Sequence, residues 1–124
     1  MIDNLIHLHV HSDYSALDGA CSLDKLIDKA KHLGQSALAL TEHGNVDSAF
    51  KFSTKCQAAG IKPIHGCEMY FAPLGIHVKD STNPNLHLTI LCKNEKGWEN
   101  LLRLVTIAHL EGFYYKPRID LDLL

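Results

Sequence analysis

Short apolar runs alternate with segments of helical periodicity along this chain, and that alternation constrains the fold more than any other feature. Helical spacing is seen after Ser22, from residue 47 to 59, and after Asn94, and a glycine ends each of these segments. The predicted strands are 5–11, 37–40, 61–71 and 87–92, with the longest loop at 72–86. The resulting order β-α-β-α-β-loop-β-α predicts an α/β fold with parallel strands, either an open sheet or a barrel.

Composition narrows the class of protein. The chain has 124 residues, which fits one small domain, and its net charge of −2 gives no global basic field for nucleic acid, although a local basic patch stays possible. It has no apolar run long enough for a membrane span, and residues 1–4 lack the pattern of a secretory signal. The four cysteines form no Cys-x-x-Cys pair, so we expect reduced thiols and a cytoplasmic protein without membrane partners.

Three histidines alternate with aliphatic residues near the start of the chain, at His7, His9 and His11. Side chains of a strand alternate between its faces, so these imidazoles are expected on one side. Neutral imidazole is a ligand for transition metals, which makes a metal site the favoured interpretation. The alternative is a strand edge with solvated histidines. We interpret His7 as structural, because three such neighbours rarely bind one ion.

Ligand-type side chains follow several predicted strands. Ligands in α/β folds bind at the carboxyl ends of the strands. His9 and His11 end the first strand, His43 follows the second, and Glu68 lies late in the third. Asp18, in the loop after the first strand, is placed to reach the same rim. The convergence of these side chains predicts a metal site.

His87 is a weaker candidate, because it is predicted at the start of its strand, the less usual end. The set mixes histidine and carboxylate without thiolate, which is typical of catalytic rather than structural metal sites. A carboxylate such as Glu68 can bridge two ions, and two ions about 3.5–4 Å apart support in-line displacement at phosphorus. Phosphoester hydrolysis is therefore the favoured chemistry.

Several motifs now identify a family resemblance. The chain resembles the PHP (polymerase and histidinol phosphatase) domain in three motifs, His9-Val10-His11-Ser12, Glu42-His43-Gly44-Asn45 and Gly66-Cys67-Glu68. It also resembles the amino-terminal region of bacterial DNA polymerase III alpha subunits, which are C-family replicative polymerases. That resemblance lies at Leu17-Asp18-Gly19-Ala20, at Ala59 to Ile64, at Gly66 to Tyr70 and at Gly112 to Asp120. The resemblance runs over nearly the whole chain.

The resemblance implies a distorted (β/α)7 barrel, of which this chain would supply the amino-terminal half, and up to three divalent ions of zinc, manganese or iron. It assigns His9, His11 and Glu68 to a first ion, and these three residues would act in catalysis through bound metal. Glu68 would bridge to a second ion held by His87. Asp18 and His43 would serve a third. Glu42 stands where the family usually has aspartate, and we expect little consequence.

Family members with an intact ligand set hydrolyse phosphodiesters as 3′–5′ exonucleases. The family's remaining ligands lie past residue 124, so residues 1–124 are expected to be the incomplete amino-terminal part of a PHP domain and to be inactive alone. The parent would be a DNA-directed DNA polymerase acting in DNA replication. Its implied partners are DNA, the palm domain in cis, a proofreading exonuclease subunit and the sliding clamp.

Two alternatives remain open. One is a stand-alone phosphatase of the histidinol-phosphatase type, against which the stretch from Gly112 to Asp120 argues. The other is a metal-free scaffold that docks polymerase partners, against which the filled ligand positions argue.

Overall fold

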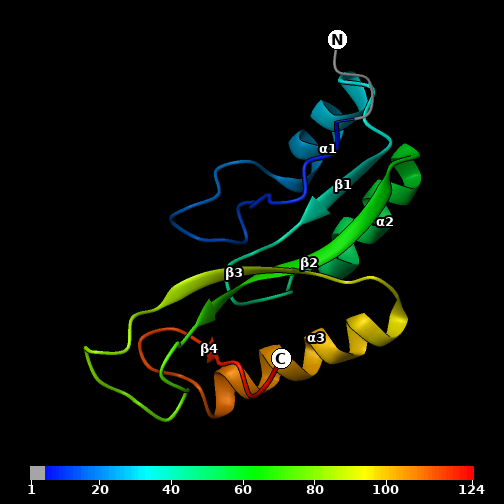
Figure 1. Ribbon diagram of the computed structural model, residues 1–124. Helices are drawn as coiled ribbons and strands as arrows, with labels where there is room; N and C mark the ends of the chain where they lie inside the picture. The colour runs from blue at the N-terminus through cyan, green and yellow to red at the C-terminus, as the bar shows by residue number, and fades with distance from the viewer. Residues whose placement is uncertain (1–4) are drawn as a thin grey trace.

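The computed structural model describes residues 5–124 as a mixed α/β unit (Figure 1). The expectation that no secretory signal is present rests on residues 1–4, which lie outside this range. The elements in chain order are α1 (Leu23–His32), β1 (Ala37–Leu40), α2 (Ala49–Ala59), β2 (Lys62–Phe71), β3 (Leu86–Leu91), α3 (Glu95–Leu110) and β4 (Arg118–Ile119). The α/β class, the three helices and the strands from residue 37 to 92 are thus confirmed, with shifts of one or two residues at their ends.

Local signals explain where the helices begin and end. The Ser22 side chain accepts a hydrogen bond from the Lys25 amide and begins α1. Asn94 caps α3 in the same way, with its Oδ1 2.9 Å from the Gly97 amide nitrogen. Gly60 ends α2 in the left-handed conformation, with φ of 73°, which glycine adopts at little cost.

The long strand β2 organises the sheet. Its first half pairs in parallel with β1, from Ala37↔Lys62 to Leu40↔His65. Its second half pairs antiparallel with β3, from Gly66↔Leu91 to Phe71↔Leu86, and its end pairs in parallel with the short strand β4. The prediction that all strands run parallel was therefore wrong for β3. The connection between β2 and β3 contains no helix, and the chain returns beside β2 in the opposite direction.

The strand predicted over residues 5–11 is absent, because this segment forms no regular ladder. Two backbone hydrogen bonds tie it to the next segment, from the Ala39 amide to the His7 carbonyl and from the Thr41 amide to the Val10 carbonyl. The two acceptors are three positions apart in sequence and the two donors are two positions apart, so the pairing is out of step. The Val10 amide instead donates to Thr41 Oγ1 at 2.9 Å.

The core falls into two clusters along β2. One packs α1 and α2 against β1, with Ile27, Leu40 and Phe52 buried. The other packs α3 and β4 against the face of β2 that carries Cys67 and Met69. Because strand side chains alternate, the opposite face of β2 presents Glu68 and Tyr70 to the site described next. Within residues 5–124, no helix has the length and apolar character to cross a membrane.

Candidate metal centre

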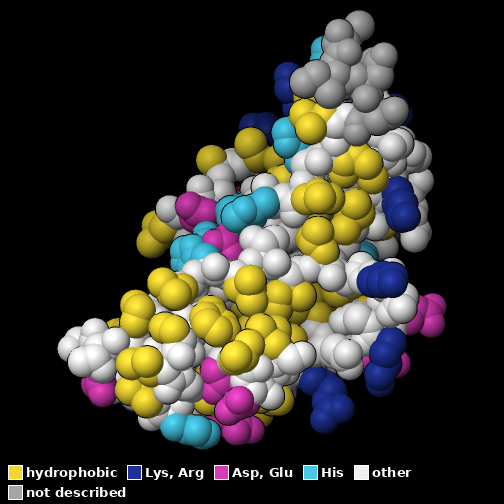
Figure 2. All heavy atoms as spheres, viewed as in Figure 1, with side chains coloured by type: hydrophobic (Ala, Val, Ile, Leu, Met, Phe, Trp, Pro, Cys, Tyr) yellow, Lys and Arg dark blue, Asp and Glu magenta, His cyan; other side chains and the backbone are white. Residues whose placement is uncertain are grey.

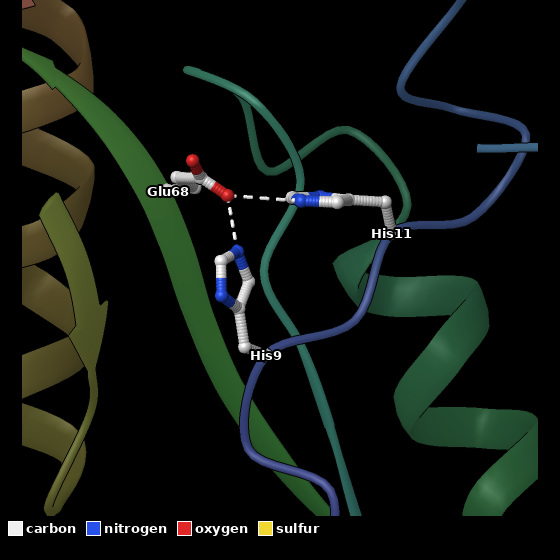
Figure 3. Close-up of side chains that lie close together, drawn as sticks. All are labelled: His9, His11 and Glu68. Atoms are coloured by element: carbon white, nitrogen blue, oxygen red, sulfur yellow. Dashed lines mark hydrogen bonds and ion pairs between the residues drawn. The ribbon is translucent and has the colours of Figure 1, made fainter. Parts of the chain in front are cut away.

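Glu68 lies at the centre of the predicted ligands and is only 3% exposed. One carboxylate oxygen, Oε2, contacts His9 Nε2 and lies 2.9 Å from His11 Nε2; both imidazoles point at it from the segment before α1 (Figure 3). The other oxygen, Oε1, lies 2.7 Å from His87 Nδ1 and 3.9 Å from His43 Nδ1. The two oxygens of one carboxylate therefore face two different groups of imidazoles.

Asp18 joins a third group. Its Oδ2 lies 3.1 Å from His43 Nε2 and 3.8 Å from His11 Nε2. Three sets of side chains consequently bring their ligand atoms within 4.8 Å of one another: His9, His11 and Glu68; His11, Asp18 and His43; and His43, Glu68 and His87. All six side chains that the sequence singled out are brought together. Figure 2 shows histidine and acidic side chains side by side on this face.

The direction of β3 explains the position of His87. The start of an antiparallel strand lies beside the end of its partner, and His87 is paired with Tyr70. Opposed residues share a face, so His87 emerges on the same side as Tyr70 and Glu68. The objection that His87 lies at the wrong end of its strand assumed a parallel sheet, and it disappears with the antiparallel pairing.

Ring packing fixes the orientation of the imidazoles. The His11 and His43 rings stack with centroids 4.2 Å apart. The Tyr70 ring stacks on the His43 ring with centroids 5.8 Å apart, and it meets the His87 ring edge to face with centroids 5.1 Å apart. The Lys116 ammonium lies 5.3 Å from the centre of the Tyr70 ring. Contacts of this kind would hold these side chains in place for an ion.

The electrostatics of the centre combine two opposing effects on Glu68. Burial raises the pKa of its carboxyl group, whereas the hydrogen bond with His9 and the charges of His43, His9 and His87 lower it. The net result is a pKa below the usual value, so Glu68 is ionised at neutral pH. An ionised carboxylate is the form that binds a metal.

Two ring nitrogens of the centre are buried without a hydrogen-bond partner within residues 5–124, namely His11 Nδ1 and His43 Nδ1. A buried polar atom without a partner carries a desolvation cost. His43 Nδ1 faces Glu68 Oε1 beside His87 Nδ1. A divalent cation at this point would be ligated by a nitrogen that otherwise has no partner, so these residues fit a metal ion.

Glu42 is a buried acidic residue beside the centre to which the sequence analysis assigned no role in the site. Its carboxylate is 2% exposed and accepts hydrogen bonds from the hydroxyls of Ser12, Ser15 and Ser48. The Ser12 amide also donates to both of its oxygens at 3.2 Å. The sequence carries no local signal for these contacts, because Ser12 and Ser15 lie 30 and 27 positions before Glu42.

The other histidines and the neighbouring thiol stand apart from the ligand groups. His7, His32 and His77 are exposed. His109 Nε2 lies 2.9 Å from the Gly44 carbonyl oxygen and supports the turn that carries His43. Cys67 is buried, its thiol donates to the Glu42 carbonyl, and burial raises its pKa to about 12. Cys67 is therefore a protonated packing residue close to the site.

Comparison with known proteins agrees with this geometry. Residues 7–124 match the PHP domain family. The chain belongs to the PHP domain family. DNA polymerase III subunit alpha of Borreliella burgdorferi is 52% identical over 120 residues, covering 94% of this chain and 10% of that protein. The same subunit of Treponema pallidum is 51% identical over 124 residues, covering 98% of this chain and 11% of that protein.

A third relative, DNA polymerase III subunit alpha of Aquifex aeolicus, is 43% identical over 133 residues, covering all of this chain and 11% of that protein. This PHP chain thus spans about one tenth of the length of the curated relatives it matches. Among solved structures, an amidohydrolase from Chromobacterium violaceum with bound sulfate and no metal matches with a TM-score of 0.56 at 24% identity. The match covers 80% of this chain and 32% of that one, and it shows a shared fold consistent with part of a PHP barrel.

Proposed function

We propose that this chain is a metal-binding segment of a phosphoesterase site. The observation that carries the proposal is the central carboxylate of Glu68, whose two oxygens face His9 and His11 on one side and His43 and His87 on the other. A carboxylate in this position suits two neighbouring divalent ions. Asp18 supplies a further ligand, so up to three ions of zinc, manganese or iron would be held.

The chemistry we propose is hydrolysis of a phosphodiester. Divalent ions would supply Lewis acidity and a clamp for phosphoryl oxygens. The contribution of the chain is to fix the ligands: His9, His11 and Glu68 are the residues through which catalysis would act, and Tyr70 packs beside the remaining imidazoles. Mixed histidine and carboxylate ligands, with no thiolate among them, support a catalytic rather than a structural centre.

We further propose that residues 1–124 correspond to the amino-terminal part of the PHP domain of a bacterial DNA polymerase III alpha subunit. Relatives with that name at 43–52% identity favour this reading over a stand-alone phosphatase. The whole protein would be a DNA-directed DNA polymerase in the bacterial cytoplasm, with a 3′–5′ exonuclease site in its PHP domain. DNA, the palm domain in cis, a proofreading exonuclease subunit and the sliding clamp would be its partners.

The test of the metal site is metal content after dialysis. Replacement of both His9 and His11 by alanine should remove at least one equivalent of bound manganese or zinc per chain, because both imidazoles meet at Glu68 Oε2. The matched control is His32→Ala, which removes an exposed imidazole at the end of α1 and should change nothing. Equal metal content in all three proteins would refute the metal site and favour a metal-free scaffold.

The same proteins test activity. We expect the wild-type chain, loaded with manganese or zinc, to hydrolyse a single-stranded oligonucleotide or a simple phosphoester poorly, because the family's remaining ligands lie past residue 124. Robust turnover that is lost in Glu68→Ala would show instead that residues 1–124 hold a sufficient site.

A further inference from the structure

The inference concerns how Asp18 and His43 are held at one point, and it rests on the proposed metal-binding function. Asp18 lies in a loop before α1, and His43 lies in the turn after β1. Their side chains meet at 3.1 Å although 25 residues separate them in sequence. His43 is tied to β2 by an isolated bridge with Glu68, whereas Asp18 lies in no helix or strand, so a further contact must tie Asp18 to His43.

Ser15 is the residue that links the two segments. Its hydroxyl oxygen accepts a hydrogen bond from the His43 amide at 3.1 Å. Its carbonyl oxygen accepts a hydrogen bond from the Asp18 amide at 3.0 Å. A single residue, 3% exposed, is thereby bonded to the backbone of both ligands. The direction of its hydroxyl determines whether the link to His43 is made.

Glu42 determines that direction. The Ser15 hydroxyl donates a hydrogen bond to Glu42 Oε2. The lone pairs of Ser15 Oγ are then free to accept the hydrogen bond from the His43 amide. Within residues 5–124, every other hydrogen-bond partner of the carboxylate is also a donor: the amide and hydroxyl of Ser12 and the hydroxyl of Ser48. A buried carboxylate surrounded by donors is satisfied only while both of its oxygens are acceptors. The hydrogen bonds around Glu42 therefore all run in one direction, from the donors to its carboxylate.

We propose that Glu42 is a positioning residue that acts through Ser15 to place Asp18 and His43 for one ion. It lies outside the three groups of ligand atoms. Its loss should therefore weaken the two sets that contain His43 and leave the set of His9, His11 and Glu68 in place. The expectation that glutamate replaces the family's usual aspartate with little consequence stays a prediction.

Glu42→Gln is the informative variant because it keeps the shape and replaces one acceptor oxygen with an NH₂ donor. If that donor faces Ser15, the hydroxyl loses its acceptor; if it faces Ser12, two donors oppose each other. Ser15→Ala breaks the link on its other side. The matched control is Ser48→Ala, which removes a 3.4 Å bond to the same carboxylate without touching the link to His43.

The experiment is a titration of the whole chain with manganese(II), followed by the electron paramagnetic resonance of the free ion. In Glu42→Gln and Ser15→Ala we expect the sites that include His43 to weaken roughly 10–100-fold, as for other residues that orient metal ligands, and the site of His9, His11 and Glu68 to stay unchanged. Ser48→Ala should bind like the wild type. Equal weakening of all classes, or equal weakening in Ser48→Ala, would overturn the proposal by indicating general destabilisation.

A second measurement separates this inference from the proposed function. Hydrogen exchange of the His43 amide in the metal-free chain should be faster in Glu42→Gln and Ser15→Ala than in Ser48→Ala. If the wild-type chain binds no manganese, the metal function fails while the exchange result still decides the role of Glu42. An unchanged exchange rate in Glu42→Gln would refute the positioning role.

Discussion

At the scale of the residue, His65 differs from the histidines of the metal centre. Its ring lies between the rings of Phe52 and Trp98, with centroids 5.8 and 5.3 Å away. Burial lowers its pKa below the usual value. His65 precedes Glu68 by three positions in sequence, and its imidazole belongs to none of the ligand groups within residues 5–124. The site it occupies favours neutral imidazole, so protonation opposes folding there.

We predict that His65 makes the chain less stable in mild acid. As pH falls through about 6.5, the unfolded chain takes up the proton before the folded chain does, so the free energy of unfolding decreases and then levels off below the folded pKa. His65→Phe keeps a ring and removes the proton site, so its stability should depend less steeply on pH. Urea denaturation of the metal-free protein at several pH values between 5 and 8 measures this. The free energy of unfolding at each pH is obtained by linear extrapolation, with an expected dependence on urea of about 1 kcal/mol per molar or more.

The exposed His77 provides the control, because His77→Phe removes a solvated imidazole and should leave the pH dependence unchanged. A wild-type slope retained in His65→Phe would assign the acid sensitivity to the metal-centre imidazoles instead.

Residue chemistry was the most predictable level of this molecule. Most of the six candidate ligands could be singled out because imidazole and carboxylate side chains lie near predicted strand ends, and the family resemblance assigned His87, which that rule disfavoured. Glu42 was not found, because its role depends on the path of the loop that brings Ser12 and Ser15 over it. Hydrogen bonds between segments about 30 residues apart leave no local pattern in the sequence.

At the scale of the element, the helices differ in how firmly their first turns are held. Asn94 Oδ1 lies 2.9 Å from the Gly97 amide nitrogen, whereas Ser22 Oγ lies 3.5 Å from the Lys25 amide nitrogen. A cap weakens steeply as its hydrogen bond lengthens. The beginning of α3 also lies directly after β3, so its capping residue orients the helix that covers one face of the sheet.

We predict that Asn94→Ala costs about 1 kcal/mol of unfolding free energy, the usual value for loss of a side-chain cap, and that Ser22→Ala costs less. Chemical denaturation of the two variants beside the wild type measures both. Asn94→Asp is the conservative control, because aspartate accepts the same bond. A larger loss from Ser22→Ala than from Asn94→Ala would show that the difference in distance does not set the strength of the caps.

Element type was predictable, but element pairing was not. The helices follow from apolar periodicity and from caps, which are local. The antiparallel direction of β3 depends on the path of the loop after β2, and the strand predicted at residues 5–11 fails because its acceptors and the donors of the next segment are out of step. β4 is two residues long and is defined only by its pairing with Tyr70 and Phe71.

At the scale of the whole molecule, β2 joins two packed units. The cluster around α1 and α2 contacts its first half, and the cluster around α3 contacts its second half. The candidate metal centre lies where the loops of the first unit meet β2 and β3 of the second. A bound ion would therefore connect the two units, and a ligand that binds only the folded chain raises the free energy of unfolding.

The edge strand β3 is the most exposed part of the sheet. Within residues 5–124 it pairs on one side only, with β2, and it carries Leu86, 48% exposed, and Leu88 and Leu91, each 36% exposed. Figure 2 shows a broad area of hydrophobic side chains over the lower part of the molecule. An apolar edge strand with free backbone groups is a template for pairing with another chain. The chain at high concentration should consequently associate through this edge.

We predict that Leu86→Lys reduces this association, because a lysine on an edge strand disfavours pairing with a second edge. The control is Leu110→Lys, which adds the same charge at the end of α3, at a position that is 79% exposed and away from the sheet. Size-exclusion chromatography with light scattering over a range of concentrations measures the mass of each protein. Leu86→Lys should shift toward the monomer while Leu110→Lys behaves like the wild type. A wild-type chain that stays monomeric throughout would contradict the prediction and would mean that the β3 edge protects itself, whereas equal effects of both lysines would assign the change to net charge.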